Sequence, residues 1–209
     1  MGKCLFMRKG EVHTNPGEGR LPFGYLALAY IESSGTQYID TGFKPNQDSR
    51  IVFDFALNPY DTSRPLFGTR DAAAKNAFCA FANTGNVYQQ DYANAQTTGL
   101  GTMNYERCII DANKTQFFVA GNLLNTQTYT DFACSYSAYL FAVNNGGNLH
   151  NNGCTAGKLY SCQVYDNDVL VRDFVPCANN VGEIGLYDFV TKTFYGNAGS
   201  GTFVGSEVA

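Results

Sequence analysis

The chain has 209 residues, of which 15% are charged and 14% are aromatic, and its formal net charge at pH 7 is −4. This balance predicts a folded chain with a substantial apolar core and excludes a disordered one. No basic cluster follows Arg8-Lys9, which argues against a nucleic-acid partner, because such proteins concentrate Lys and Arg to displace phosphate counterions.

Glycine and asparagine shape the prediction of secondary structure. The chain contains 22 glycines and 20 asparagines, two residue types that tolerate positive φ at low cost. Many tight turns are therefore expected, and long helices are not. The one helical candidate is a single turn at Asp71–Lys75, with Asp71 as its cap.

The first 24 residues carry Gly, Pro, Lys and Glu without periodicity and are interpreted as an arm that attaches the protein to its partners. The apolar runs of this arm are too short for a secretory signal. No uncharged apolar stretch anywhere in the chain is long enough for a membrane span. Residues 25–209 form the expected domain, in which short strands alternate with turns. In residues 49–58, Ile51, Phe53 and Phe55 alternate with polar or mixed positions, which predicts a strand with one apolar face.

Three hairpins are expected in the second half of the chain, each with a polar turn between apolar runs. Their turns lie at residues 112–114, 166–168 and 190–192. A closing strand is expected at residues 202–204.

Seven cysteines are present and none forms a C-x-x-C pair, which argues against zinc ribbons and thioredoxin-like sites. The number is odd, and several lie inside apolar strand patterns. We therefore expect reduced core thiols in a protein made and folded in a cytoplasm. They are Cys4, Cys79, Cys108, Cys134, Cys154, Cys162 and Cys177.

Four segments together resemble a known family. They are "YIESSGTQYIDTGF", "DANKTQFFVAG", "LYSCQVYDNDVLVRDFVPC" and "GEIGLYDFVTKTFYGNAGSGTF". They look like the LamG-like, concanavalin A-like lectin/glucanase domains, closest to those of phages and prophages of gut Firmicutes. The resemblance covers about residues 25–205 and implies an all-β fold: a two-sheet antiparallel jelly-roll sandwich whose first and last strands are neighbours. It does not imply an activity, because one fold hosts many functions.

Three patterns that could carry chemistry are interpreted as structural. The glycine run at residues 196–201 is followed by Thr202 and Phe203 and the end of the chain, not by the helix that a phosphate loop needs. The Glu-x-Asp-x-x-Glu motif of the glucanases is absent, so no catalytic residue is expected. Asp166-Asn167-Asp168 could ligate calcium but is read as a hairpin turn, and no metal or cofactor is expected.

Two segments carry the amide and aromatic side chains that bind sugars. In "GNVYQQDYAN", the i, i+2, i+4 spacing of Tyr88, Gln90 and Tyr92 places them on one face of a strand. The polar loop at residues 143–153 adds four more candidates. The alternative is a solvated loop beside an ordinary half-exposed strand. The loop candidates are Asn144, Asn145, Asn148 and His150.

The sequence therefore predicts a non-enzymatic phage virion component, a fibre, tail or decoration module that presents a lectin-like domain to a bacterial surface glycan. It would be made in the host cytoplasm, contact other virion proteins through the arm and form a homo-oligomer. One alternative is a purely structural decoration protein that binds only other virion proteins. The other is a glycoside hydrolase or a cell-surface lectin of a gut bacterium.

Overall fold

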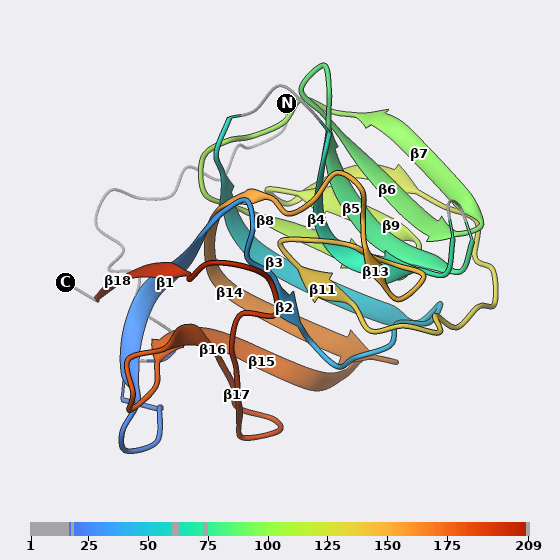
Figure 1. The fold of residues 1–209 in the computed structure, drawn as a ribbon. Helices are drawn as coiled ribbons and strands as arrows, with labels where there is room; N and C mark the ends of the chain where they lie inside the picture. Colours follow the sequence, from blue (N-terminus) through green and yellow to red (C-terminus); the bar gives the residue numbers. More distant parts are fainter. Residues whose placement is uncertain (1–16, 18, 60–62, 73–74, 208–209) are drawn as a thin grey trace.

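The computed structural model describes residues 17, 19–59, 63–72 and 75–207. Within these residues the chain consists of strands, turns and loops, arranged as two sheets packed face to face (Figure 1). This confirms the predicted all-β, two-sheet antiparallel sandwich. The greater part of the expected arm, residues 1–16 and 18, lies outside the described residues.

The larger sheet, sheet A, contains both ends of the described domain. Its main path runs β10-β9-β8-β3-β14-β1-β15-β16-β17, and β18 pairs with β1. All of these pairings are antiparallel. The strands are β1 (Leu26–Ser34), β3 (Ser49–Leu57), β8 (Cys108–Asn113), β9 (Gln116–Val119), β10 (Asn122–Thr126), β14 (Ala156–Asp166), β15 (Val169–Ala178), β16 (Ile184–Asp188), β17 (Thr193–Tyr195) and β18 (Val204–Glu207).

The smaller sheet, sheet B, runs β13-β12-β4-β5-β6-β7, and β11 joins it by pairing with both β2 and β4. Among its described pairings, only β12 with β4 is parallel. This pair brings the segment after residue 143 back along β4. The strands are β2 (Ile39–Asp40), β4 (Arg64–Arg70), β5 (Ala77–Asn83), β6 (Val87–Ala93), β7 (Ala95–Leu100), β11 (Tyr139–Leu140), β12 (Asn144–Asn145) and β13 (Asn148–Leu149).

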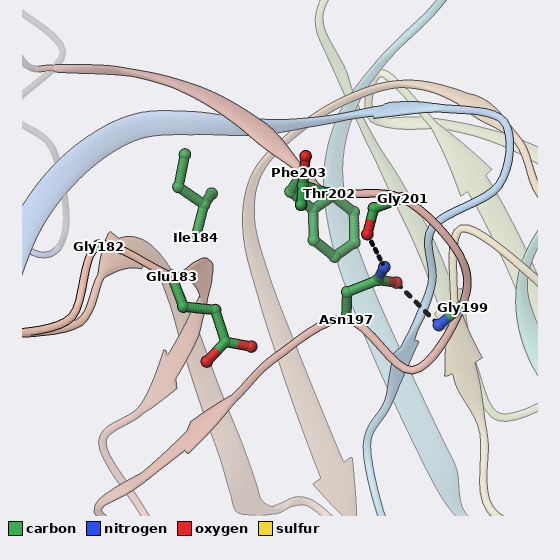
Figure 2. Close-up of a pocket in the computed structure, with 8 residues that line it drawn as sticks. All are labelled: Gly182, Glu183, Ile184, Asn197, Gly199, Gly201, Thr202 and Phe203. Carbon is green, nitrogen blue, oxygen red and sulfur yellow. Dashed lines mark hydrogen bonds between the residues drawn. The ribbon is translucent and has the colours of Figure 1, made fainter.

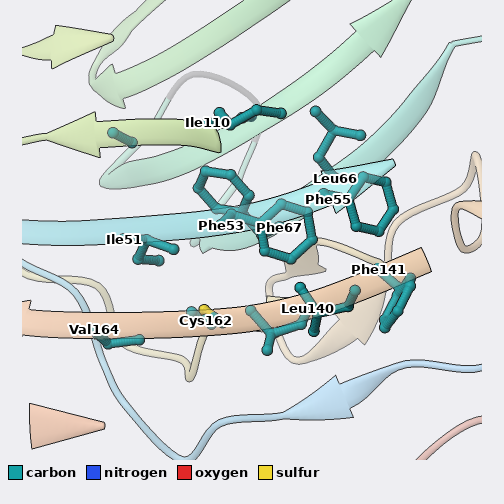
Figure 3. Close-up of a cluster of buried hydrophobic side chains, with 14 of the residues drawn as sticks. Ile51, Phe53, Phe55, Leu66, Phe67, Ile110, Leu140, Phe141, Cys162 and Val164 are labelled. Atoms are coloured by element: carbon teal, nitrogen blue, oxygen red, sulfur yellow. The ribbon is translucent and has the colours of Figure 1, made fainter. Parts of the chain in front are cut away.

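The core between the sheets is dominated by aromatic rings. β3 alternates buried and half-buried positions along its whole length, as predicted, and directs Phe53 and Phe55 inward. The Phe53 ring centroid lies 4.6 Å from that of Phe55 and 5.2 Å from that of Phe67 on β4, while Phe55 meets Phe141 at 5.4 Å. Figure 3 shows these rings gathered with the side chains of β14. Ring pairs in this range add stability beyond their buried area.

The three predicted hairpins are present. In the β14–β15 hairpin, Asp166 pairs with Val169, so the turn consists of Asn167 and Asp168, both at positive φ. In the β8–β9 hairpin the turn is Lys114 and Thr115, slightly later than expected, and Lys114 takes the positive φ. The predicted closing strand lies later as well, since β18 begins at Val204.

The prediction of a helical turn at Asp71–Lys75 is wrong for those of its residues that the structure describes. Ala72 and Lys75 form a β-bridge, and the Asp71 N–H donates to the Lys75 carbonyl. Asp71 is held instead by its side chain, which accepts hydrogen bonds from Asn76 and from Ser135. These contacts fix the described residues of the segment between β4 and β5, whereas Ala73 and Ala74 lie outside the described residues.

The first and last strands are neighbours, as the family resemblance implies. β18 pairs antiparallel with β1 from Leu28 to Glu32, and Figure 1 shows the two strands side by side. Before β1, Leu21 and Tyr25 pack on the outer face of sheet A against an apolar cluster on β15 and β16. Packing therefore begins within the segment expected to be the arm.

The described cysteines carry no disulfide. Cys79, Cys134, Cys154, Cys162 and Cys177 are buried, and Cys108 is half-buried, in agreement with their expected place in the core. Burial raises the pKa of these thiols, including Cys79 on β5 and Cys162 on β14, which are both deeply buried. Among the described residues, no helix is long and apolar enough to cross a membrane.

Gly68 is a point where sheet B cannot accept a side chain. Its φ is +115°, and a Cβ would lie 2.1 Å from the Phe78 carbonyl oxygen and 2.5 Å from the Cys79 Cα. We expect Gly68→Ala to lower the free energy of unfolding by about 3 kcal/mol more than a positive-φ glycine in open space does, because backbone atoms have to move.

Gly121→Ala is the matched control, since φ is +76° there and nothing lies within 4 Å. It carries only the left-handed backbone cost, about 1–2 kcal/mol. Urea denaturation of both variants measures the difference. Equal losses would show that the close approach at Gly68 does not constrain the sheet.

Candidate functional site

The predicted sugar-binding set on β6 shares one face of the strand, but that face is the inner one. Tyr88, Gln90 and Tyr92 are 0%, 3% and 1% exposed, respectively. The Tyr88 ring meets Phe117, and the Tyr92 ring meets Phe78. The prediction that the i, i+2, i+4 spacing places these three residues on one face of the strand was correct. The prediction that this face is open to a sugar was wrong.

The polar ends of these three side chains are satisfied inside the protein. The Tyr88 hydroxyl accepts from the Asn104 N–H at 2.9 Å, and the Tyr92 hydroxyl donates to the Gln47 carbonyl. Gln90 accepts from the Asn125 amide at 2.9 Å. Burial raises the pKa of Tyr88 to about 12. A sugar cannot reach this set, so it is withdrawn as a binding site.

The four loop candidates separate into different roles. Asn144 is 3% exposed, and its side chain donates to the Ser137 carbonyl and accepts from the Gly147 N–H. It organises the loop and is also withdrawn as a ligand contact. Asn145 is half-buried and accepts from Arg70 Nε at 2.8 Å. Asn148 is exposed on β13.

His150 is the loop residue that the structure places at a hollow. It lies over the outer face of sheet B, with its ring centroid 5.2 Å from that of Phe81. Its Nδ1 accepts a hydrogen bond from the Asn152 N–H at 3.2 Å, so the neutral ring carries its proton on Nε2. Burial, and then the charge of Arg70, lower the pKa of His150 below 6.5.

The outer face of sheet B carries a polar network centred on Asp91. Strand register places Gly68, Cys79, Asp91 and Gln96 in one row across β4 to β7. The Asp91 carboxylate accepts from Gln89 Nε2 at 2.6 Å and from Gln96 Nε2 at 3.0 Å. Burial raises the pKa of Asp91, while these hydrogen bonds and Arg70 oppose that shift.

Arg70 at the end of β4 completes the network. Its Nη1 lies 3.3 Å from Asp91 Oδ2, and the side chains of the pair are 9% and 0% exposed. Buried ion pairs of this kind need further hydrogen bonds to offset their desolvation. Asn145, Gln89 and Gln96 supply them here.

These groups surround a hollow of about 280 Å³. Strands β4, β5, β6 and β7 and the loop after β13 all contribute to its wall. A concave site with a few convergent polar groups is the usual form of a small-ligand site. We call it the His150 hollow, and it is lined by Ser63, Arg70, Phe81, Gln89, Gln96, His150 and Asn152.

A second hollow, of about 450 Å³, lies beside the C-terminal glycine run (Figure 2). Asn197 there uses its amide within the loop, accepting from the Gly199 N–H and donating to the Gly201 carbonyl. Glu183 accepts from the Asn179 amide at 3.2 Å. The glycine run shapes a loop that pairs with residues 36–38. The polar side chains that line this second hollow, Glu183, Asn197 and Thr202, all come from loops, whereas strands supply three of those that line the His150 hollow.

The hairpin interpretation of Asp166-Asn167-Asp168 is consistent with the contacts. Asp166 accepts from the Asn46 amide, and Asp168 pairs with Lys114 at 2.8 Å. In the part of the chain that the structure describes, no group of three or more His, Cys, Asp or Glu side chains is placed to hold a metal ion.

Sequence reasoning missed Arg70, Gln89, Gln96, Ser63 and Asn152. A signal was present for Gln89: if Tyr88 and Tyr92 fill the core, alternation along the strand places Gln89 on the outer face. The sequence held no such signal for Arg70, because its place in the site depends on the parallel pairing of β12 with β4.

No protein-family model matches the chain, and no curated protein matches it. Among solved structures, the chain is similar to a native heptameric SAP-like pentraxin from Limulus polyphemus. The identity is 8%, the TM-score is 0.43, and the match covers 70% of this chain and 76% of that one. We draw no functional conclusion from so distant a likeness, and take the function from the site.

Removing Asp91 should destabilise the protein strongly. Asp91→Ala leaves Arg70 buried without its counterion, so we expect a loss of about 3–5 kcal/mol in the free energy of unfolding. Asp111→Ala is the control, because Asp111 pairs with Arg50 at 2.7 Å on a more exposed surface. Its loss should be about 1 kcal/mol or less. Denaturant titration of both variants tests this, and equal losses would contradict it.

The pKa of His150 should lie below 6.5, with the neutral ring protonated at Nε2. The unfolded chain takes up this proton near 6.5 and the folded chain only at lower pH, so stability falls as the pH drops through that window. NMR titration of the imidazole resonances measures the value. The chain has two histidines, and His150→Gln assigns the signals. A pKa above 6.5 would show that the ring is not held as described.

Proposed function

We propose that this chain is a non-enzymatic glycan-binding module and that the sugar lies in the His150 hollow. The observation that carries the proposal is the convergence on that hollow of polar side chains from β4, β6 and β7, from Ser63 just before β4 and from the loop after β13. Hydroxyl-rich ligands are recognised by fixed donors and acceptors, and the network around Asp91 fixes several of them.

The absence of catalysis is part of the proposal. The described residues that line the hollow include neither Asp nor Glu. Glycoside hydrolysis ordinarily uses two carboxyl groups, about 5–5.5 Å apart or about 6.5–9.5 Å apart. Asp91 beneath the hollow is fully buried and engaged by Gln89, Gln96 and Arg70, which supports a role in positioning.

We further propose that the module is displayed on a phage particle and faces a bacterial surface. The resemblance to phage-borne lectin-like domains supports this setting. Two exposed apolar side chains near the described end of the arm support attachment there: Phe23 and Val181 are 107% and 81% exposed, and their chain neighbours Gly24 and Asn180 approach each other. Exposed apolar side chains of this size are typical of interaction surfaces.

Binding to an array of bacterial cell-wall polysaccharides tests the glycan proposal. We expect His150→Ala and Gln96→Ala each to weaken binding by about 3–10-fold, the value of one hydrogen bond. Asn122→Ala is the control, because Asn122 is exposed on β10, in the other sheet. The proposal fails if no glycan binds, or if the control weakens binding equally.

The virion setting has a separate test. Deleting residues 1–24 should abolish incorporation into particles. Normal host adsorption by particles that lack residues 25–209 would favour the purely structural alternative, in which the protein contacts only other virion proteins.

A further inference from the structure

The ion pair beneath the His150 hollow has a fixed orientation. The Arg70 side chain, 9% exposed, lines the hollow, whereas the Asp91 side chain is 0% exposed and lies below it. Gln89, Gln96 and Cys79 also direct hydrogen bonds at the Asp91 carboxylate. A ligand in the hollow therefore meets the positive end of the pair.

The Arg70 guanidinium keeps N–H groups for a ligand. It has five N–H donors, and its hydrogen bonds to described residues use Nε for Asn145 and one Nη1 proton for Asp91. The same two bonds hold the guanidinium plane in place. A planar fork fixed in this way matches the paired oxygens of a carboxylate or a phosphate.

The rest of the wall is also favourable to an anion. Arg70 is the one charged residue among the described residues of the lining. Arg64, at the other end of β4, donates from Nη1 to the carbonyl of the lining residue Asn152 at 2.5 Å. His150, protonated on Nε2, presents a further donor. Burial lowers the pKa of His150, and the charge of Arg70 lowers it further, which is consistent with a positive potential in the hollow.

We infer that the His150 hollow selects an anionic sugar, one that bears a carboxylate or a phosphate, and that the Arg70 guanidinium receives the anionic group. This inference rests on the proposed glycan-binding function and specifies its ligand class. A neutral sugar would leave these N–H groups buried without a charged acceptor, and such groups are costly to desolvate.

Three polymers serve as probes: polygalacturonate, the same polymer with its carboxyl groups reduced to alcohols, and poly(glycerol phosphate). We expect at least one anionic polymer to bind and, for the uronate, carboxyl reduction to weaken binding at least tenfold. The two anionic probes distinguish a carboxylate from a phosphate. Higher salt should weaken anionic binding.

Asn152→Asp tests the site without removing a buried charge. The change keeps the size of the side chain and leaves the backbone bonds of Asn152 to His150 and Arg64 in place. A carboxylate on the wall should weaken binding of the anionic polymer at least tenfold by repulsion and by competition for Arg70. Asn122→Asp on β10 adds the same charge outside the hollow and should leave binding unchanged.

The outcomes separate the two proposals. If neutral glycans bind as well as anionic ones, and His150→Ala weakens both, glycan binding stands and the anionic preference is overturned. If an anionic polymer binds and Asn152→Asp has no more effect than Asn122→Asp, the assignment to this hollow is overturned. If neither the array nor the polymers bind, both proposals fail.

Discussion

Two sheets with apolar inner faces have to cover each other, and this requirement decides which side chains remain for any other use. Phe53, Phe55, Phe67 and Phe141 fill the space between the sheets, and β6 contributes two tyrosines to the same layer. Because successive side chains point to opposite faces, burying those tyrosines forces Gln89 and Asp91 outward. The polar network and the hollow above it follow from that choice of face.

Sheet B is covered in part on its outer face as well. Val143, from the loop that returns along β4, packs on Ala77, Cys79 and Phe81. This explains why β4 and β5 are buried almost continuously, a pattern expected of strands with both faces covered. It also explains how an Arg–Asp pair on an outer face can be as buried as a core residue.

Local sequence patterns predicted the alternation in β3 and the turn at residues 166–168. The pairing of the first and last strands was expected only from the family resemblance. The sequence did not predict the candidate site, for two physical reasons. Tyrosine suits a core and a sugar platform equally well, so Tyr88 and Tyr92 did not reveal which face of β6 is inside. The position of Arg70 depends on a contact with Asn145, 75 residues away, that no local pattern encodes.

The pairing of β18 with β1 has a consequence for engineering. Leu28 is a register partner of Glu207, so the described chain enters and leaves the domain on adjacent strands. A domain with its entry and exit side by side can be inserted into a surface loop of a carrier protein without spreading that loop apart. A short flexible peptide could likewise join the two strands, and the chain could be reopened at an exposed turn such as Gly85 to give a circular permutant.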